Sequence, residues 1–193
     1  ADIGGAVQGG YNPAATECWQ EGLRIPPVKV VDRGRLRRDV WDLIFANIRL
    51  DIVSEDMKAE MGACVVGERR LRALISKYGA ETFEDVKQHL FESTRRMMEA
   101  EIRTIPEGTY TGEATVYYDG RTPGTTYEIR VRITVADGRI SFDYSDTDAQ
   151  TPGFVNGTYT SSASATILTF LQMVNPDIPH NEGMVEPIDI VIP

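Results

Sequence analysis

The sequence predicts an α+β protein in which a helical region precedes a sheet-rich region. Between residues 36 and 106 apolar residues recur at intervals of three and four, which is typical of helices with one buried face. Between residues 127 and 135 apolar and polar residues alternate, as in a strand with one wet face. Glycine and proline are concentrated in residues 1–35, which favours loops. We therefore expect a loop segment over 1–35, a helical region over 36–106, and a sheet-rich region with one buried helix over 107–193.

Within the helical region the pattern predicts helices over residues 36–78, with a break at 50–55, and one long helix over 82–105. Thr82 is the expected N-cap of the long helix, because its side chain can accept a hydrogen bond from the first turn. Pro106 and Gly108 are expected to end that helix. Cys64 lies in an apolar stretch and is expected to be a buried, inert thiol.

The sheet-rich region predicts strands over 109–118, 127–135 and 140–144, paired antiparallel. Asp137-Gly138 supplies the positive φ angles of a tight hairpin between the second and third strands. Residues 161–174 are almost uncharged and rich in small side chains, so we expect a helix packed on several sides. A last strand is expected over 188–192.

Composition argues against several classes of function. The chain has 193 residues and a net charge of −9, which argues against general binding to nucleic acids or anionic membranes. It contains no apolar run near the roughly 18 residues that a membrane span requires. Its two cysteines form neither a disulfide framework nor a metal cluster, so a cytoplasmic location is expected.

Asp2 is the first candidate site residue, because a carboxylate before the Gly4-Gly5 pair suits a loop whose backbone approaches a ligand or metal ion. The alternative is an Asx-type turn. The sequence contains no Walker-type phosphate loop and no Gly-x-Ser-x-Gly nucleophile motif. Residue chemistry alone therefore identifies no catalytic residue.

Two further groups of polar residues have weaker claims to a functional role. His180 and Glu182 lie in a polar loop between prolines, where a structural role is favoured over a catalytic one. Asp143, Asp146 and Asp148 have a spacing like the start of a calcium loop, but the glycine and distal glutamate of such a loop are missing. Turn formation is the favoured interpretation of this acidic segment.

A series of short segments, in order along the whole chain, resembles the hydantoinase B/oxoprolinase family. The segments that carry the resemblance are Ala1-Asp2-Ile3-Gly4-Gly5, Gln20-Glu21-Gly22-Leu23, Ile25-Pro26-Pro27-Val28-Lys29, Asn47-Ile48-Arg49, Asp56 and Ala59, Arg70-Leu71 with Tyr78-Gly79, Ile105-Pro106-Glu107-Gly108-Thr109-Tyr110, Asp143-Tyr144-Ser145-Asp146-Thr147-Asp148, Asn156, and Asn175-Pro176-Asp177-Ile178-Pro179 with Asn181 and Gly183 after them.

The resemblance implies a part of the B-type subunit of an ATP-dependent cyclic-amide hydrolase of the hydantoinase or 5-oxoprolinase type. It implies a hydantoinase A-like partner subunit that uses ATP and Mg, and a small-molecule substrate. A subunit of an ATP-dependent acetone or acetophenone carboxylase is an alternative, and a non-catalytic subunit-interaction module is another. Family members are several hundred residues long, so we expect a segment of a larger subunit that is inactive alone.

The resemblance also implies a divalent metal ion of unknown identity. Asp2 matches an aspartate that the family pairs with a preceding histidine, and that histidine would fall before Ala1. Asp2 is therefore the one expected metal ligand. Catalytic and other cofactor-binding residues are left unassigned.

Overall fold

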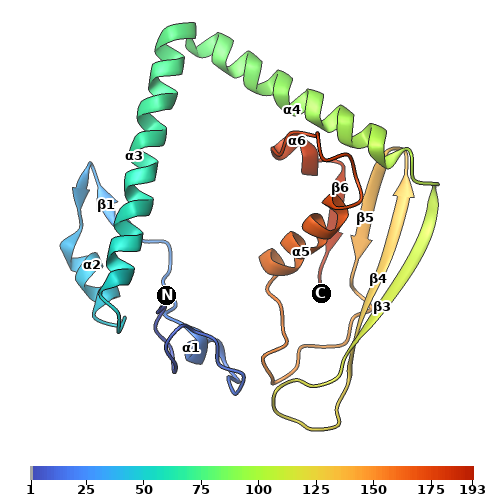
Figure 1. The fold of residues 1–193 in the computed structure, drawn as a ribbon, viewed down its shortest axis with the longest axis horizontal. Coiled ribbons are helices and arrows are strands. Elements are labelled where there is room, and N and C mark those ends of the chain that lie inside the picture. The colour runs from blue at the N-terminus through green and yellow to red at the C-terminus, as the bar shows by residue number, and fades with distance from the viewer. Residues whose placement is uncertain (1) are drawn as a thin grey trace. The chain divides into compact units, whose positions relative to one another are not determined.

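The computed structural model describes residues 2–193, and its chain divides into two compact units (Figure 1). Unit 1 contains the residues up to 73 together with 120–122 and 152–154. Unit 2 contains residues 74–119, 123–151 and 155–193. Helices and a mixed sheet are both present, so the predicted α+β class is confirmed. None of the helices formed by the described residues is long and apolar enough to cross a membrane.

Unit 1 consists of a long glycine-rich loop and short elements: α1 (Cys18–Glu21), β1 (Val31–Asp32), β2 (Arg35–Leu36) and α2 (Arg38–Phe45). The strands form an antiparallel hairpin, whose turn residues Arg33 and Gly34 both have positive φ. α3 (Ile52–Tyr78) begins in this unit. The helix break expected at residues 50–55 overlaps the interval between the end of α2 at Phe45 and the start of α3 at Ile52.

The burial prediction for Cys64 is wrong. Cys64 is exposed, and α3 buries none of its residues among the part of the chain that the structure describes. The neighbouring Val65 is likewise exposed. An apolar sequence predicts burial only where another element packs against it, and the described residues place none over this stretch.

Unit 2 contains α4 (Ala80–Ile102), α5 (Tyr159–Leu171) and α6 (Glu182–Val185) beside one sheet. The strands β3 (Gly108–Val116), β4 (Tyr127–Ala136) and β5 (Arg139–Asp143) pair antiparallel, which confirms the predicted pairing. β6 (Ile188–Val191) then pairs parallel to β5, after a crossover that includes α5 and α6. The sheet order is β3-β4-β5-β6.

The core of unit 2 lies where α4 and α5 meet one face of this sheet. Alternate residues of β4 and β5 supply Val135, Ile140 and Phe142, and the Phe142 and Phe170 rings meet edge to face at 5.8 Å. The buried apolar side chains of this core are Met98, Ile102, Val135, Ile140, Phe142, Phe170, Ile178 and Met184. Burial of these side chains stabilises the unit by roughly 1.5–3 kcal/mol for each large residue.

Two details of the helices differ from expectation. α4 begins at Ala80 with Gly79 as its N-cap, so the cap prediction for Thr82 is wrong. Gly79 has a φ of 86°, and this single residue separates α4 from α3 without a capping side chain. α5 buries Thr166 and Phe170 but leaves Leu168 62 % exposed, so within the described residues it packs on one side rather than several.

Candidate functional site: the Asp2 loop

The glycine-rich loop of unit 1 is held against residues 20–23. The Leu23 N–H donates to the Ile3 carbonyl over 2.8 Å, and the Ala6 N–H donates to the Gln20 carbonyl over 2.8 Å. Gly5 has a φ of 83°, and a Cβ atom there would lie 2.6 Å from the Gln20 oxygen. Glycine is therefore required by both the backbone conformation and the close approach.

Asp2 is fully buried in this loop, and its carboxylate accepts three hydrogen bonds from residues that the structure describes. Oδ1 accepts from the Gly4 N–H over 3.3 Å and from Arg49 Nη1 over 3.2 Å. Oδ2 accepts from the Arg49 main-chain N–H over 2.5 Å. Arg49 also donates from Nη2 to the Gly5 carbonyl over 2.6 Å. One arginine therefore contacts both carboxylate oxygens and the glycine turn.

The main-chain hydrogen bond from Arg49 is the chief cause that holds the pKa of Asp2 below its usual value of 3.8. Burial acts in the opposite direction, and the Gly4 N–H and the Arg49 guanidinium reinforce the lowering of the pKa. The carboxylate is therefore ionised at neutral pH, which is the state that a metal ion requires of a ligand.

The Asp2 carboxylate is an oxygen donor of the kind that divalent metal ions bind. Each carboxylate oxygen has two lone pairs. From the described residues, Oδ1 accepts two hydrogen bonds and Oδ2 accepts one. Across residues 2–193 no three histidine, cysteine, aspartate or glutamate side chains converge. Asp2 alone does not make a metal site, and further ligands would be needed.

An open hollow of about 530 Å³ lies beside the glycine turn in unit 1. Its lining includes the Gly4-Gly5 backbone, Glu17 and the Trp19 ring. The Arg24 guanidinium lies 5.1 Å from the centroid of that ring. The lining of the hollow therefore includes an aromatic, a cationic and an acidic residue next to the loop that holds Asp2.

A model of the family described as hydantoinase B/oxoprolinase matches residues 1–193 of this chain. The chain belongs to that family. The resemblance drawn from the short segments is thereby confirmed.

Among curated relatives of this family member, the beta subunit of caprolactamase from Pseudomonas jessenii is 36 % identical, over 95 % of this chain and 31 % of that protein. The B component of a putative D-/L-hydantoinase from Pseudomonas sp. (strain NS671) is 32 % identical, over 100 % of this chain and 34 % of that protein. The chain thus spans about a third of the length of these relatives.

Two solved structures share the fold of this hydantoinase B segment. The crystal structure of ATP-dependent caprolactamase from Pseudomonas jessenii gives a TM-score of 0.91 at 34 % identity, over 100 % of this chain and 33 % of that one. A nucleotide-free acetone carboxylase structure gives a TM-score of 0.81 at 18 % identity, over 97 % of this chain and 27 % of that one. The second likeness concerns the fold alone.

The family segment at residues 175–183 joins α6 to α4. The Asn181 side chain caps α6 by accepting from the Gly183 N–H over 2.9 Å, and its Nδ2 donates to buried Thr94 Oγ1 over 2.9 Å. Gly183 is buried against the Phe91 main chain. His180 and Glu182 are exposed, and neither joins a metal-binding cluster among the described residues. The favoured structural interpretation of this loop agrees with these contacts.

The acidic family segment at 143–148 covers an edge of β4 that β5 leaves open. β5 pairs only with residues 132–136 of β4. At the open end Thr147 Oγ1 accepts from the Arg130 N–H over 3.1 Å and donates to the Arg130 carbonyl over 3.0 Å. Asp148 exchanges hydrogen bonds with the Glu128 main chain through its own N–H and Oδ2, over 3.0 and 2.8 Å. Side chains therefore replace a neighbouring strand along this edge.

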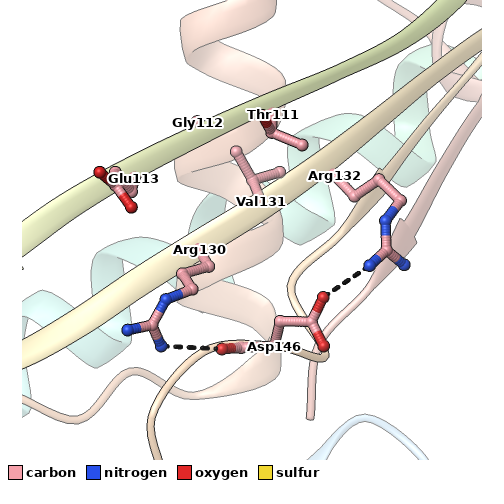
Figure 2. Close-up of a pocket in the computed structure, with 7 residues that line it drawn as sticks. All are labelled: Thr111, Gly112, Glu113, Arg130, Val131, Arg132 and Asp146. Carbon is pink, nitrogen blue, oxygen red and sulfur yellow. Dashed lines mark hydrogen bonds and ion pairs between the residues drawn. The ribbon is translucent and has the colours of Figure 1, made fainter.

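The same segment lines a hollow on the polar face of β3 and β4, shown in Figure 2. Arg132 Nη2 donates to Asp146 Oδ2 over 2.7 Å, and Arg130 Nη1 donates to the Asp146 carbonyl over 3.1 Å (Figure 2). Arg130 also pairs with Asp148 over 2.9 Å. The carboxylates of this segment are thus engaged with arginines and main-chain groups, which supports the turn-forming interpretation over a calcium site.

Removing the Thr147 hydroxyl should destabilise the sheet edge. Thr147→Val leaves both the Arg130 N–H and carbonyl without their partner, and we expect a loss of about 1–3 kcal/mol of unfolding free energy. Thr147→Ser keeps the hydroxyl and should recover most of that stability. Urea denaturation of the two variants measures the difference. Equal stability of the valine and serine variants would contradict the edge-covering role.

Asp2 should also make the free energy of unfolding depend on pH below about pH 4. Its folded-state pKa lies below 3.8, so its contribution to stability is complete above about pH 4 and is lost as pH falls through the folded-state value. Asp2→Asn should therefore differ most from the native sequence at pH 5–7 and progressively less below pH 4. Urea midpoints measured from pH 7 to pH 2.5 test this. A stability difference between Asp2→Asn and the native sequence that grew as the pH fell would contradict this prediction.

Arg49 is the partner of Asp2 that the sequence alone does not reveal. It enters the family resemblance only as part of Asn47-Ile48-Arg49, and nothing local connects it with Asp2. The two residues lie 47 positions apart, and only the fold brings them together. Cationic residues are frequent in the sequence, so charge alone does not single it out.

Proposed function

We propose that this chain is part of the B-type subunit of an ATP-dependent cyclic-amide hydrolase, which acts with an A-type partner subunit that uses ATP and Mg. The observation that carries the proposal is the likeness to the Pseudomonas jessenii caprolactamase. It spans the whole chain at a TM-score of 0.91 and 34 % identity, and the sequence of the beta subunit is 36 % identical. Both of the relatives described above are named for cyclic amides and as parts of multi-chain enzymes.

We further propose that Asp2 is one ligand of a divalent metal ion. The ionised state of the carboxylate, whose pKa is held below its usual value, supports this role. A bound divalent ion would supply polarisation of a carbonyl oxygen. The contributions of this chain's own residues are to hold Asp2 ionised, through the Arg49 and Gly4 donors, and to shape the glycine turn beside the hollow.

The ketone carboxylase alternative has weaker support. The acetone carboxylase structure is 18 % identical, so it shares the fold without favouring the activity. The interaction-module alternative is supported by α3, which buries no residue in the described part of the chain and leaves Leu71 and Leu74 exposed. Such a face is compatible with an enzyme subunit as well.

The two free, exposed cysteines support a reducing compartment, and we propose that the protein lies in the cytoplasm.

Substrate-dependent ATP turnover tests the proposed function. The purified complex of the intact subunit with its A-type partner is supplied with ATP and Mg and, in separate assays, ε-caprolactam, hydantoin, 5-oxoproline, acetone or acetophenone, the ketones with bicarbonate. We expect at least one cyclic amide to stimulate ATP hydrolysis and no ketone to do so. Stimulation by a ketone with bicarbonate alone would overturn the hydrolase proposal in favour of the carboxylase. Turnover unaffected by removal of the B-type subunit would favour the interaction module.

A further inference from the structure

Unit 2 contains a further hollow, of about 300 Å³, whose lining includes residues of β4, of α5 and of the segment that joins β5 to α5. We propose that this hollow binds a neutral cyclic amide, and that Tyr144 and Ser162 recognise its amide group. The class of ligand rests on the proposed function. The place of the site and its two recognising residues rest on contacts within unit 2.

Apolar side chains form one part of the lining. Val116 of β3 and Ile129 of β4 contribute to it, together with Val155 of the segment before α5. Val116 and Val155 are half-buried. Ligand pockets combine such an apolar lining with a few polar groups, and about 300 Å³ is the lower end of their usual volume. The hollow therefore suits a small ring made mainly of methylene groups.

A chain of hydroxyl groups connects the hollow with α5. The buried Thr166 hydroxyl donates to the Ser162 carbonyl over 2.9 Å, so its one proton is engaged. Tyr144 lines the hollow, and its hydroxyl oxygen lies 2.9 Å from Thr166 Oγ1. The Tyr144 hydroxyl must therefore donate this second hydrogen bond. Among the described residues none donates to the Tyr144 oxygen, which can accept a hydrogen bond from a ligand.

Ser162 supplies a donor to the same hollow. It is half-buried in the lining, and the described part of the chain provides no hydrogen-bond partner for its hydroxyl. A Cβ atom at Gly157 would lie 2.7 Å from Ser162 Oγ, so this hydroxyl lies against the backbone of another lining residue. The serine hydroxyl can therefore donate to a ligand carbonyl, while the Tyr144 oxygen accepts from a ligand N–H.

A donor and an acceptor in one small hollow complement the edge of a cyclic amide. A small ring holds its amide cis, so the N–H and the carbonyl lie on the same side. An open-chain secondary amide is almost always trans and turns these two groups to opposite sides. Thr166 joins Tyr144 to Ser162 through two hydrogen bonds of 2.9 Å, so the two residues lie near each other. The pair therefore favours a cyclic amide over an open-chain one.

The charges of the lining favour a neutral ligand. Its charged members are Glu128 and Asp148, and none of the described residues in the lining is a lysine, arginine or histidine. Asp148 pairs with Arg130, which does not line this hollow, over 2.9 Å. The Glu128 carboxylate accepts from the Thr115 hydroxyl, which leaves its charge in place. A ligand with its own carboxylate would find no cation in the lining to pair with it.

Dissociation constants measured by ligand-observed NMR test this site. The purified complex of the intact subunit with its partner is used without ATP. The probes are ε-caprolactam and cycloheptanone, a ketone of the same ring size that has no N–H. We expect the native protein to bind the lactam about tenfold more tightly than the ketone, which is the effect of one net hydrogen bond.

Two variants of the lining should change these affinities in different ways. Tyr144→Phe should weaken lactam binding by about tenfold and leave ketone binding unchanged, because only the lactam donates to the Tyr144 oxygen. Ser162→Ala should weaken both ligands by about tenfold, because both have the carbonyl that the serine contacts. Tyr159→Phe and Ser164→Ala are the matched controls, since both residues are exposed on α5 outside the lining. The controls should bind both ligands as the native protein does.

Native lactam affinity in both lining variants would overturn the site. Equal weakening of the lactam and the ketone in Tyr144→Phe would also overturn it, because loss of the N–H acceptor affects only the lactam. Circular dichroism and thermal melting show which variants fold. If Tyr144→Phe does not fold, the Ser162→Ala affinities decide, and if Ser162→Ala does not fold, the Tyr144→Phe affinities decide.

A pair of ligands tests the charge of the lining without any variant. 2-Pyrrolidinone has the ring of 5-oxoproline and lacks its carboxylate. We expect the native protein to bind 2-pyrrolidinone at least about tenfold more tightly than 5-oxoproline, because the carboxylate would be desolvated beside acidic residues. Equal affinities, or tighter binding of 5-oxoproline, would overturn the preference for a neutral ligand.

Turnover distinguishes failure of this site from failure of the proposed function. Lactam binding that depends on Tyr144 and Ser162, without ATP-dependent ring opening of any cyclic amide, would leave the site in place and overturn the proposed function. ATP-dependent opening of ε-caprolactam, with native lactam affinity in both lining variants, would support the proposed function and overturn the site.

Discussion

Asp2→Asn is expected to lower the proposed ATP-dependent ring opening by at least about 100-fold, because the metal ion that we propose at Asp2 would supply several kcal/mol of transition-state stabilisation. An asparagine side chain keeps the size of aspartate and one oxygen acceptor, but it offers no anionic ligand. Its amide also meets the Arg49 N–H or guanidinium with a donor, whichever way it is turned. Product formation by the purified complex measures the loss.

Asp39→Asn is the matched control for this loss of activity. Asp39 also receives an arginine fork, from Arg37, but it is exposed on α2. The control should retain native activity. Turnover within about threefold of native in Asp2→Asn would contradict the proposed role of Asp2, since even the loss of a residue that only orients a metal ligand typically costs about 10–100-fold.

Gly183→Ala is expected to destabilise unit 2 by about 3 kcal/mol, the upper part of the range for overpacking. A Cβ atom at this position would overlap the Phe91 carbonyl group, and the obstacle is main chain of α4 rather than a movable side-chain tip. Either α6 or the turn at Phe91 would have to shift. That shift would also disturb the Asn181–Thr94 hydrogen bond. Chemical denaturation gives the change in unfolding free energy.

Gly67→Ala is the control for the effect of a methyl group on a helical glycine. Gly67 lies within α3, where an added Cβ meets nothing within 4 Å among the described residues. We expect a stabilisation of about 0.5–1 kcal/mol, because alanine loses less conformational freedom in a helix than glycine does. A Gly183→Ala protein as stable as Gly67→Ala would contradict the close packing of α6 on α4.

Features of the fold that depend on local sequence were predictable. The alternation over residues 127–135 matches β4, and Asp137-Gly138 forms the expected hairpin with φ angles of 53° and 75°. The parallel pairing of β6 with β5 was not predictable, because it depends on how residues 144–187 cross over. The exposure of Cys64 was missed for a related reason. Periodicity shows which face is apolar, but it does not show whether another element covers that face.

The candidate site likewise has one part that the sequence predicts and another part that it does not. Asp2 and the glycines are adjacent in sequence, so a loop with a carboxylate could be predicted there. Its partner Arg49 is brought in by the end of α2, over a separation that leaves no local signal. The hydrogen bonds between Thr147 and Arg130 also join residues that are distant in sequence, 17 positions apart. Long-range contacts of this kind decide whether a polar residue binds a ligand or supports the fold.

We propose that this chain is part of an enzyme that opens cyclic amides with ATP. The products formed when a lactam and a ketone are supplied together test this proposal most directly. The intact complex is incubated with ATP, Mg, ¹³C-labelled bicarbonate, ε-caprolactam and acetone together, and the products are identified by mass spectrometry. We expect the ring-opened amino acid, heavier than the lactam by one water and free of ¹³C. A ¹³C-carboxylated ketone with the lactam left intact would contradict the account.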